Sequence, residues 1–247
     1  MKRLLAFLGV TLLSAGCSTS PAADTTLTVF AAASLKQTFT ELGDRFETDH
    51  PGTTVTFNFA GSADLAAQLV QGAPADVFAS ADVANMTRAV DAGLVAGSPV
   101  DFAANTLTIV TAPGNPKSIN AFADLAAPDV QSVMCAPQVP CGAAAAQIEQ
   151  ATGVELSPVS EESAVTDVLG KVTSGQADAG LVYVTDATAA GDKVATVAFP
   201  EAADAVTTYP IAMLADATDP TAARQFLDLV TGPAGQEILS AAGFAAP

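Results

Sequence analysis

The sequence predicts an α/β protein made of two lobes, and three observations support this prediction. Strand-like and helix-like hydrophobic patterns alternate along the chain, which is typical of parallel sheets covered by helices. Half of the 247 residues are hydrophobic, but Trp is absent and aromatic residues make up only 6%, a composition that suits closely packed α/β layers. The segment from Tyr209 onward is too short to fold alone, so we expect it to pack back on the first lobe.

Residues 1–17 have the pattern of an export signal rather than of a folded element. Two basic residues precede an apolar run from Leu4 to Leu13, which is too short to span a bilayer comfortably, and Cys17 follows shortly after. The pattern resembles a bacterial lipoprotein signal, which is cleaved before the cysteine that then carries the lipid. Ser14 stands where that pattern usually has Leu, and ordinary secretory cleavage is the alternative.

Export gives the other two cysteines an oxidising environment. Cys135 and Cys141 are six residues apart, and pairing is the default expectation outside the cytosol. A disulfide that closes so short a loop contributes roughly 2 kcal/mol. Metal binding is the weaker interpretation, because no third or fourth soft ligand lies nearby and the only histidine is His50.

Two serines stand where a predicted strand meets the start of a helix. The strand Leu27–Ala31 leads to Ser34, and the strand Thr53–Phe59 leads through Ala60-Gly61 to Ser62. At a helix start several backbone N–H groups lack partners and the macrodipole is positive, so an anion can be held there without a cationic side chain. Each serine is either an ordinary N-cap or a donor of an N–H and a hydroxyl to one ligand.

The remaining elements follow the same alternation. Strands are predicted over residues 75–79, 106–110, 130–136, 179–184, 194–199 and 209–214, and helices over 82–93, 122–128, 143–153 and 165–174 and around 226–230 and 238–239. The pair Glu161 and Glu162 is interpreted as the solvated first turn of a helix. Tyr183, at the end of a buried strand, is either a core aromatic residue or a donor to a ligand.

The chain is expected to cross between the lobes twice, near residues 103–106 and 200–208. Lobe 1 is assigned residues 26–104 and 207–247, lobe 2 residues 105–206, and residues 18–25 are expected to form a flexible tether. Ligands of α/β sheets collect at the C-terminal ends of strands, where helix N-termini point. A ligand crevice between the two lobes is therefore expected.

The charge balance restricts the partners of the protein. Nine Lys and Arg stand against 26 Asp and Glu, which gives a formal net charge of −17. This field repels polyanions, so we expect no nucleic acid partner. A small anion is still compatible, because helix dipoles at a site outweigh a distant, salt-screened surface charge.

Four separated motifs occur in order and at compatible spacing. They are Val29–Leu35 (VFAAASL), Ala60-Gly61-Ser62, Gly72–Asp82 (GAPADVFASAD) and Gly180–Tyr183 (GLVY). Together they resemble the molybdate-binding proteins of bacterial molybdate ABC importers, over a stretch from about Leu27 to Phe244. The resemblance implies a two-lobed periplasmic-binding-protein fold that closes like a hinge on molybdate or tungstate.

The resemblance also implies which residues hold the ligand. Ser34, Ser62 and Tyr183 would donate through their hydroxyls, and Cys141 and Val165 through their backbone N–H groups. Cys141 departs from the pattern, because the family often has Ala there. A backbone donor tolerates that change, but a disulfide to Cys135 would fix the loop.

The implied protein is a receptor without cofactor or enzymatic activity. It would be a monomer, anchored by lipid to the cell membrane on its extracytoplasmic face, that delivers the oxyanion to an ABC permease. One alternative is a receptor for sulfate or another oxyanion. The other is a secreted hydrolase using Ser34 or Ser62, which His50 does not favour because it follows the first helix, remote from both serines.

Overall fold

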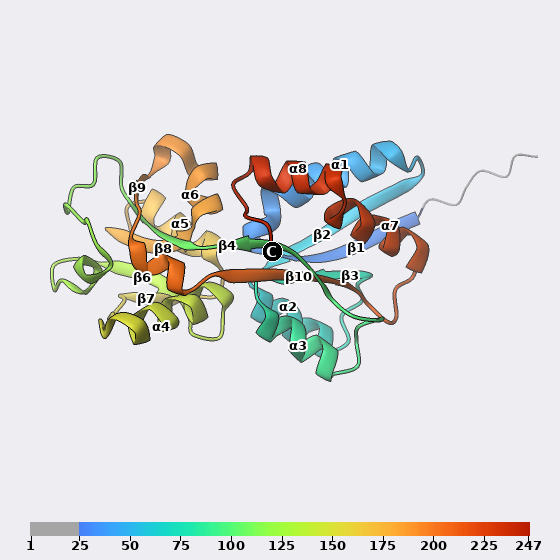
Figure 1. Ribbon diagram of the computed structural model, residues 1–247, viewed down its shortest axis with the longest axis horizontal. Coiled ribbons are helices and arrows are strands. Elements are labelled where there is room, and N and C mark those ends of the chain that lie inside the picture. The colour runs from blue at the N-terminus through green and yellow to red at the C-terminus, as the bar shows by residue number, and fades with distance from the viewer. Residues whose placement is uncertain (1–24) are drawn as a thin grey trace, which may run out of the picture.

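Two five-stranded mixed sheets form the framework of the molecule. The computed structural model describes residues 25–247, and Figure 1 shows the two sheets in separate lobes, each flanked by helices. The predicted signal peptide, the lipidation of Cys17 and the tether up to residue 24 lie outside the described residues. Thr25, which was assigned to the tether, is the first residue of a strand. No helix within residues 25–247 is both long and apolar enough to cross a membrane.

The first sheet has the strand order β2-β1-β3-β10-β4. Its strands are β1 (Thr25–Ala32), β2 (Thr53–Ala60), β3 (Val77–Ala79), β4 (Val100–Asn105) and β10 (Thr207–Met213). The first three strands are parallel, so their C-terminal ends share one edge, as the alternating sequence pattern predicts. Strand β10 pairs antiparallel with both β3 and β4, which returns the end of the chain to this sheet.

Helices cover both faces of the first sheet (Figure 1). They are the 3₁₀ turn η1 (Ala33–Leu35), α1 (Lys36–Asp49), α2 (Ser62–Val70), α3 (Val83–Asp91), α7 (Pro220–Thr231) and α8 (Pro233–Ala241). On one face, α1 and α7 bury Phe39, Phe46 and Phe226 in edge-to-face contacts. On the other face, α2 and α3 pack Leu65 and Met86 against the sheet.

The second sheet has the strand order β7-β6-β8-β5-β9. Its strands are β5 (Leu107–Thr111), β6 (Ser132–Cys135), β7 (Ser160–Glu162), β8 (Ala179–Tyr183) and β9 (Ala195–Val197), and its helices and 3₁₀ turns are η2 (Phe122–Ala126), α4 (Pro140–Thr152), α5 (Val165–Thr173), α6 (Val184–Ala190), η3 (Gly191–Lys193) and η4 (Pro200–Asp204). Strands β6, β7 and β8 are parallel, whereas β5 runs antiparallel to β8 and β9. The parallel strands of both lobes thus lead directly into helix N-termini.

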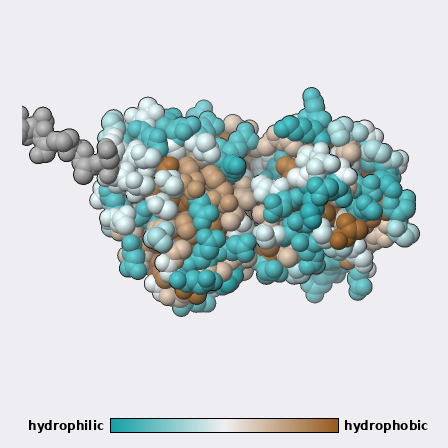
Figure 2. All heavy atoms as spheres, turned by 180° about the vertical axis from the view of Figure 1, so that it is seen from behind, coloured by the Kyte–Doolittle hydropathy of each residue, from teal (hydrophilic) through white to brown (hydrophobic). Residues whose placement is uncertain are grey.

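Two neighbouring segments connect the lobes. Strand β4 ends at Asn105 and β5 begins at Leu107 in the other sheet, and Asn105 pairs with Thr207 at the start of β10. The crossings therefore lie side by side, and Figure 2 shows from behind that the two rounded bodies meet at a waist. Such a pair of connections is the geometry of a hinge.

Among the strands and α-helices of residues 25–247, β4, β7 and α6 were not predicted. Glu161 and Glu162, interpreted as a helix start, lie instead in the edge strand β7. Three polar residues on a sheet edge need no apolar alternation, because one side of such a strand faces solvent. Helix α6 begins at Val184 directly after β8, so no turn residue separates it from the strand.

Candidate functional site

A small cavity lies between the lobes at the helix starts that follow β1, β2, β6 and β7. Its volume is about 10 Å³, and it is lined by Ala32, Ala33, Ser34, Gly61, Ser62, Ala81, Val139, Pro140, Cys141, Val165 and Tyr183. All five residues expected to hold a ligand are therefore brought to one place, although their binding role stays a prediction. A cavity of this size is on the order of what one water-sized group needs. Only a compact ligand therefore suits the site, and any ligand of several atoms holds the lobes slightly further apart than they are in this structure.

The two serines of lobe 1 enter the cavity from η1 and α2. Ser34 is half-buried, and its Oγ lies 3.1 Å from Oη of Tyr209. Ser62 is 1% exposed, and its Oγ accepts a hydrogen bond of 2.9 Å from the backbone N–H of Ala81. Neither serine is an N-cap, because Ala32 precedes η1 and Gly61 precedes α2 as the cap residues. The interpretation of these two serines as ordinary N-caps is therefore wrong.

Two backbone N–H groups of lobe 2 come from helix starts. Cys141 follows Pro140 in the first turn of α4, and Val165 is the first residue of α5. Within residues 25–247, neither N–H donates a hydrogen bond to another backbone group. Orphan donors are normal in the first turn of a helix, and here they lie on the wall of a cavity.

Tyr183 supplies the remaining polar group of the cavity. Its side chain is 1% exposed, and no atom of the described chain makes a hydrogen bond with its Oη. Burial raises the pKa of Tyr183 well above its usual range, although the nearby Thr207 side chain acts to lower it, so the hydroxyl keeps its proton. An unpaired buried hydroxyl costs about 1–3 kcal/mol of stability. A ligand that accepts a hydrogen bond from this hydroxyl would offset that cost.

Small residues let the two lobes approach each other around these donors. A Cβ at Gly61 would overlap the carbonyl oxygen of Ser163 on the opposite lobe. A polar contact joins the lobes nearby, where Nδ2 of Asn85 lies 3.5 Å from the carbonyl oxygen of Gln138. The structure is therefore that of a closed cleft.

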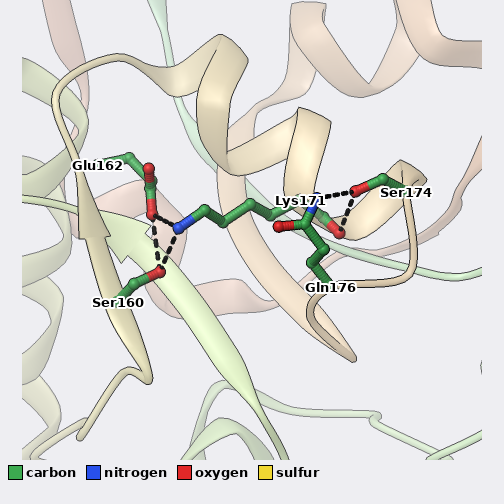
Figure 3. Close-up of polar contacts among 5 residues, drawn as sticks. All are labelled: Ser160, Glu162, Lys171, Ser174 and Gln176. Atoms are coloured by element: carbon green, nitrogen blue, oxygen red, sulfur yellow. Dashed lines mark hydrogen bonds and ion pairs between the residues drawn. The ribbon is translucent and has the colours of Figure 1, made fainter.

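Covalent and polar cross-links hold the lobe 2 donors in place. A disulfide joins Cys135 at the end of β6 to Cys141 in α4, with 5.6 Å between the Cα atoms. Figure 3 shows that Lys171 of α5 reaches Glu162 and Ser160 of β7, with Nζ 2.5 Å from Oε1 and 2.8 Å from Oγ. Both cross-links tie a helix that begins at the cavity to the sheet behind it.

The electrostatics of the cavity rest on dipoles rather than on charged side chains. No charged residue is among those that line it. A neighbouring groove of about 410 Å³ shares Ser34 with the cavity and includes Lys36 and Asp186 in its walls. Burial raises the pKa of Asp186 to about 7, although its carboxylate accepts a hydrogen bond from the N–H of Tyr183. The carboxyl group of Asp186 in this groove is thus only partly charged at neutral pH.

Two groups that shape the site were missed by sequence reasoning, namely Tyr209 and the N–H of Ala81. Tyr209 comes from β10, 175 residues after Ser34, and no local pattern links the two positions. The available signal was that Tyr209 is one of only two tyrosines in the chain. No cluster of His, Cys, Asp and Glu that could hold a metal ion occurs in the part of the chain that the structure describes.

His50 lies far from both serines. It follows α1, a helix of 14 residues that begins two positions after Ser34, and such a helix is about 21 Å long. Its ring stacks on Phe46, and its Nδ1 lies 3.0 Å from that residue's carbonyl oxygen. The imidazole therefore packs on the last turn of α1 and is not positioned to activate Ser34 or Ser62.

Comparisons with known proteins agree with this architecture. A family model described as bacterial extracellular solute-binding protein matches residues 27–245. The molybdate-binding protein ModA of Mycobacterium tuberculosis is 55% identical over 234 residues, 93% of this chain and 90% of the relative. ModA of Escherichia coli is 30% identical over 253 residues, 98% of each chain.

A solved structure shares the two-lobed arrangement. The periplasmic molybdate-binding protein of Azotobacter vinelandii superposes with a TM-score of 0.78 at 25% identity, covering 90% of this chain and 99% of the other. The predicted two-lobed periplasmic-binding-protein fold is thereby confirmed. The chain belongs to the bacterial extracellular solute-binding proteins and, within them, to the group of the relatives named molybdate-binding protein ModA.

Proposed function

We propose that this protein captures molybdate outside the cytoplasm and delivers it to an ABC permease. Relatives that are 55% and 30% identical to this chain carry the name molybdate-binding protein. The single observation that favours an oxyanion is the buried hydroxyl of Tyr183, which is unpaired within residues 25–247, in a cavity where two helix N–H groups also lack a backbone partner in that part of the chain.

Molybdate suits a site made of donors. A fully deprotonated oxyanion offers only acceptors, so every N–H and O–H that faces it can be used. In this proposal Ser34, Ser62 and Tyr183 donate through hydroxyls, and Cys141 and Val165 through backbone N–H groups. Helix dipoles replace a cationic side chain, and their effect is larger inside a closed cleft than in water. Tungstate, which has the same shape and charge, is expected to bind as well.

Delivery requires that the loaded receptor differ from the empty one. Closure over the anion buries donors of both lobes against one ligand, so a permease can distinguish the two states by their shape. The proposal places the mature protein on the extracytoplasmic face of the membrane, held by a lipid on Cys17, as a monomer. It binds its cargo without a cofactor and without chemical change, since His50 is not positioned to activate either serine.

Calorimetry on the mature protein tests the proposal. Molybdate and tungstate should bind, whereas sulfate and phosphate should bind far more weakly. Ser34→Ala should weaken molybdate binding by about 1–3 kcal/mol, the range of a hydrogen bond to a charged group. Ser240→Ala, at an exposed position of α8, is the matched control. Preference for sulfate or phosphate, or no binding of any of the four anions, would overturn the proposal.

A further inference from the structure

The hydroxyl of Tyr209 is held rigidly against Ser34. The Tyr209 side chain is 0% exposed, and its ring contacts those of Phe102, Tyr183 and Phe244, with centroids 6.3, 5.9 and 5.3 Å away. This packing leaves Oη of Tyr209 3.1 Å from Oγ of Ser34. The contact is therefore fixed by the core of lobe 1 and by the lobe boundary, not by a mobile side chain.

A serine hydroxyl has one proton, and its direction decides what the cavity offers a ligand. If Ser34 donated to Tyr209, the cavity would face a lone pair of Ser34. If Tyr209 donates to Ser34, the proton of Ser34 is free to point into the cavity. An anion in the cavity is repelled by the first arrangement and bound by the second, so the loaded site requires Tyr209 to be the donor.

Ser62 shows the same arrangement with no ambiguity of direction. Its Oγ accepts from the backbone N–H of Ala81 at 2.9 Å, and an N–H can only donate. The proton of Ser62 is therefore not used in that contact. Each serine thus has a donor behind it, a backbone amide for Ser62 and a phenol for Ser34.

We propose that Tyr209 is a positioning residue of the anion site, whose hydroxyl donates to Ser34 and so directs the proton of Ser34 onto the ligand. The inference rests on the proposed function. Burial raises the pKa of Tyr209 far above its usual range, against a smaller opposing effect of its hydrogen bond to Ser34, so the donor keeps its proton.

The arrangement also bears on which anions the site rejects. Ser62 accepts a hydrogen bond from Ala81, and in this proposal Ser34 accepts one from Tyr209. Both serine hydroxyls then direct their proton, and not a lone pair, toward the ligand. A hydrogen-bearing anion such as hydrogenphosphate then places its own O–H against donors and leaves it unpaired, which is costly in a buried site. Tyr209 therefore acts on selectivity as well as on affinity.

A double-mutant cycle with Ser34 tests the role of Tyr209. Tyr209→Phe keeps the ring and removes only the hydroxyl. In the wild-type background it should weaken molybdate binding about 3- to 10-fold, the range of a neutral hydrogen bond, and narrow the preference for molybdate over phosphate. In the Ser34→Ala background it should change affinity less than about 2-fold, since the acceptor is gone. Equal losses in both backgrounds, or no loss in wild type, would overturn the inference.

The control and a second measurement separate this inference from the proposed function. Thr108→Val removes another buried hydroxyl, which donates to the carbonyl oxygen of Val197 away from the cavity, and should leave both affinities unchanged. With only two tyrosines in the chain, 3-fluorotyrosine labelling gives one ¹⁹F signal each for Tyr183 and Tyr209. Molybdate should shift both signals, and the Tyr209 shift should shrink in Ser34→Ala. A Tyr209 signal that ignores molybdate contradicts the positioning role, whereas failure of wild type to bind molybdate contradicts the proposed function itself.

Discussion

Tyr183 combines a structural cost with a binding benefit in one atom. In the closed structure its hydroxyl is buried without a partner, so closing the lobes over an empty cavity carries the cost of an unmade hydrogen bond. Binding sites often keep such a destabilising group because the ligand supplies the missing partner. Closure of the empty protein and affinity for the ligand should therefore respond to this hydroxyl with opposite signs.

Tyr183→Phe should ease closure of the empty protein and lower affinity. Removing the unpaired hydroxyl is expected to make closure without ligand more favourable by about 1 kcal/mol and to weaken molybdate binding by about 1–3 kcal/mol. Small-angle scattering without ligand and calorimetry with molybdate measure the two effects. A variant that closes no more readily and binds as well as wild type would show that the hydroxyl serves the core instead of the ligand.

Asp186→Asn should change how stability depends on pH. Burial raises the pKa of Asp186 from 3.8 to about 7, so the folded protein holds a proton that the unfolded chain releases. The resulting stabilisation of the folded state is fully present below about pH 4 and is lost as the pH rises through 7. The neutral amide cannot lose it. Variant and wild type should thus have similar free energies of unfolding at pH 3, where the carboxyl group is protonated in both the folded and the unfolded chain, and the variant should be more stable at pH 8, by up to a few kcal/mol. Denaturation at both pH values, with the exposed Asp44→Asn as control, measures this, and equal curves at pH 8 would contradict it.

At the residue scale, the sequence located residues that line the cavity better than the groups packed behind them. Ser34 and Ser62 stand at strand–helix junctions that can be recognised locally, and Tyr183 ends an apolar run. Tyr209 and Ala81 matter only because β10 and the segment after β3 fold against these serines. Such pairings depend on sheet order, which no local pattern of one sequence specifies.

Secondary-structure elements place the donors by ending at the same boundary between the lobes. The first turns of η1, α2, α4 and α5 all contribute to the cavity wall. Parallel strands make this possible, because each strand delivers the following helix to the same edge of its sheet. This part of the fold was predictable, since periodicity identifies strand–helix pairs and parallel pairing follows from their alternation.

The missed elements lacked such a signal. Strand β7 has only three residues, Ser160–Glu162, and two of them are acidic. Its position is stabilised by Lys171 on the next helix, α5, which contacts both Glu162 and Ser160 (Figure 3). Lys171 lies eleven residues after Ser160 in the sequence. Contacts with the rest of the fold determine whether such a short edge segment forms a strand, because the propensity of its residues alone favours a solvated turn.

Lys171→Met should destabilise lobe 2 in a pH-dependent way. Although burial opposes the shift, hydrogen bonds from Lys171 and Ser160 lower the pKa of Glu162 below its ordinary 4.5. The cross-link therefore contributes stability above that pH and loses it as the pH falls further. At pH 7 the variant is expected to lose about 1 kcal/mol of unfolding free energy, measured by urea denaturation, and Glu162→Gln in the same chain should recover part of it. A loss that persists at pH 3 would show that the aliphatic stem of Lys171 matters more than its charge.

The whole molecule functions through the relation between its lobes. The cavity of about 10 Å³ is lined by residues of both lobes, so separation of the lobes opens the site to a ligand. The two connections through Asn105 and Thr207 are adjacent strands, and bending there separates the lobes without breaking either sheet. Affinity thus includes the free energy of closure, and a change that blocks closure weakens binding even when every donor is intact.

Gly61→Val tests closure without removing any donor. In the closed structure a Cβ at Gly61 overlaps the carbonyl oxygen of Ser163 across the cleft. The backbone of Gly61 has φ −59° and ψ 140°, which any residue adopts, so the substitution should leave the open form unstrained. We expect molybdate affinity to fall more than about 10-fold as the closed state becomes less populated.

Scattering and calorimetry together identify closure as the cause. The radius of gyration of the wild-type protein should decrease when molybdate binds, and that of Gly61→Val should stay near the ligand-free value. Gly170→Val is the matched control, because a Cβ there meets no atom within 4 Å, and it should bind and close like wild type. If Gly61→Val closed and bound normally, the contact with Ser163 would be a passive consequence of packing. If it bound weakly yet closed normally, the substitution would have disturbed the donor at Ser62, and closure would not be what limits affinity.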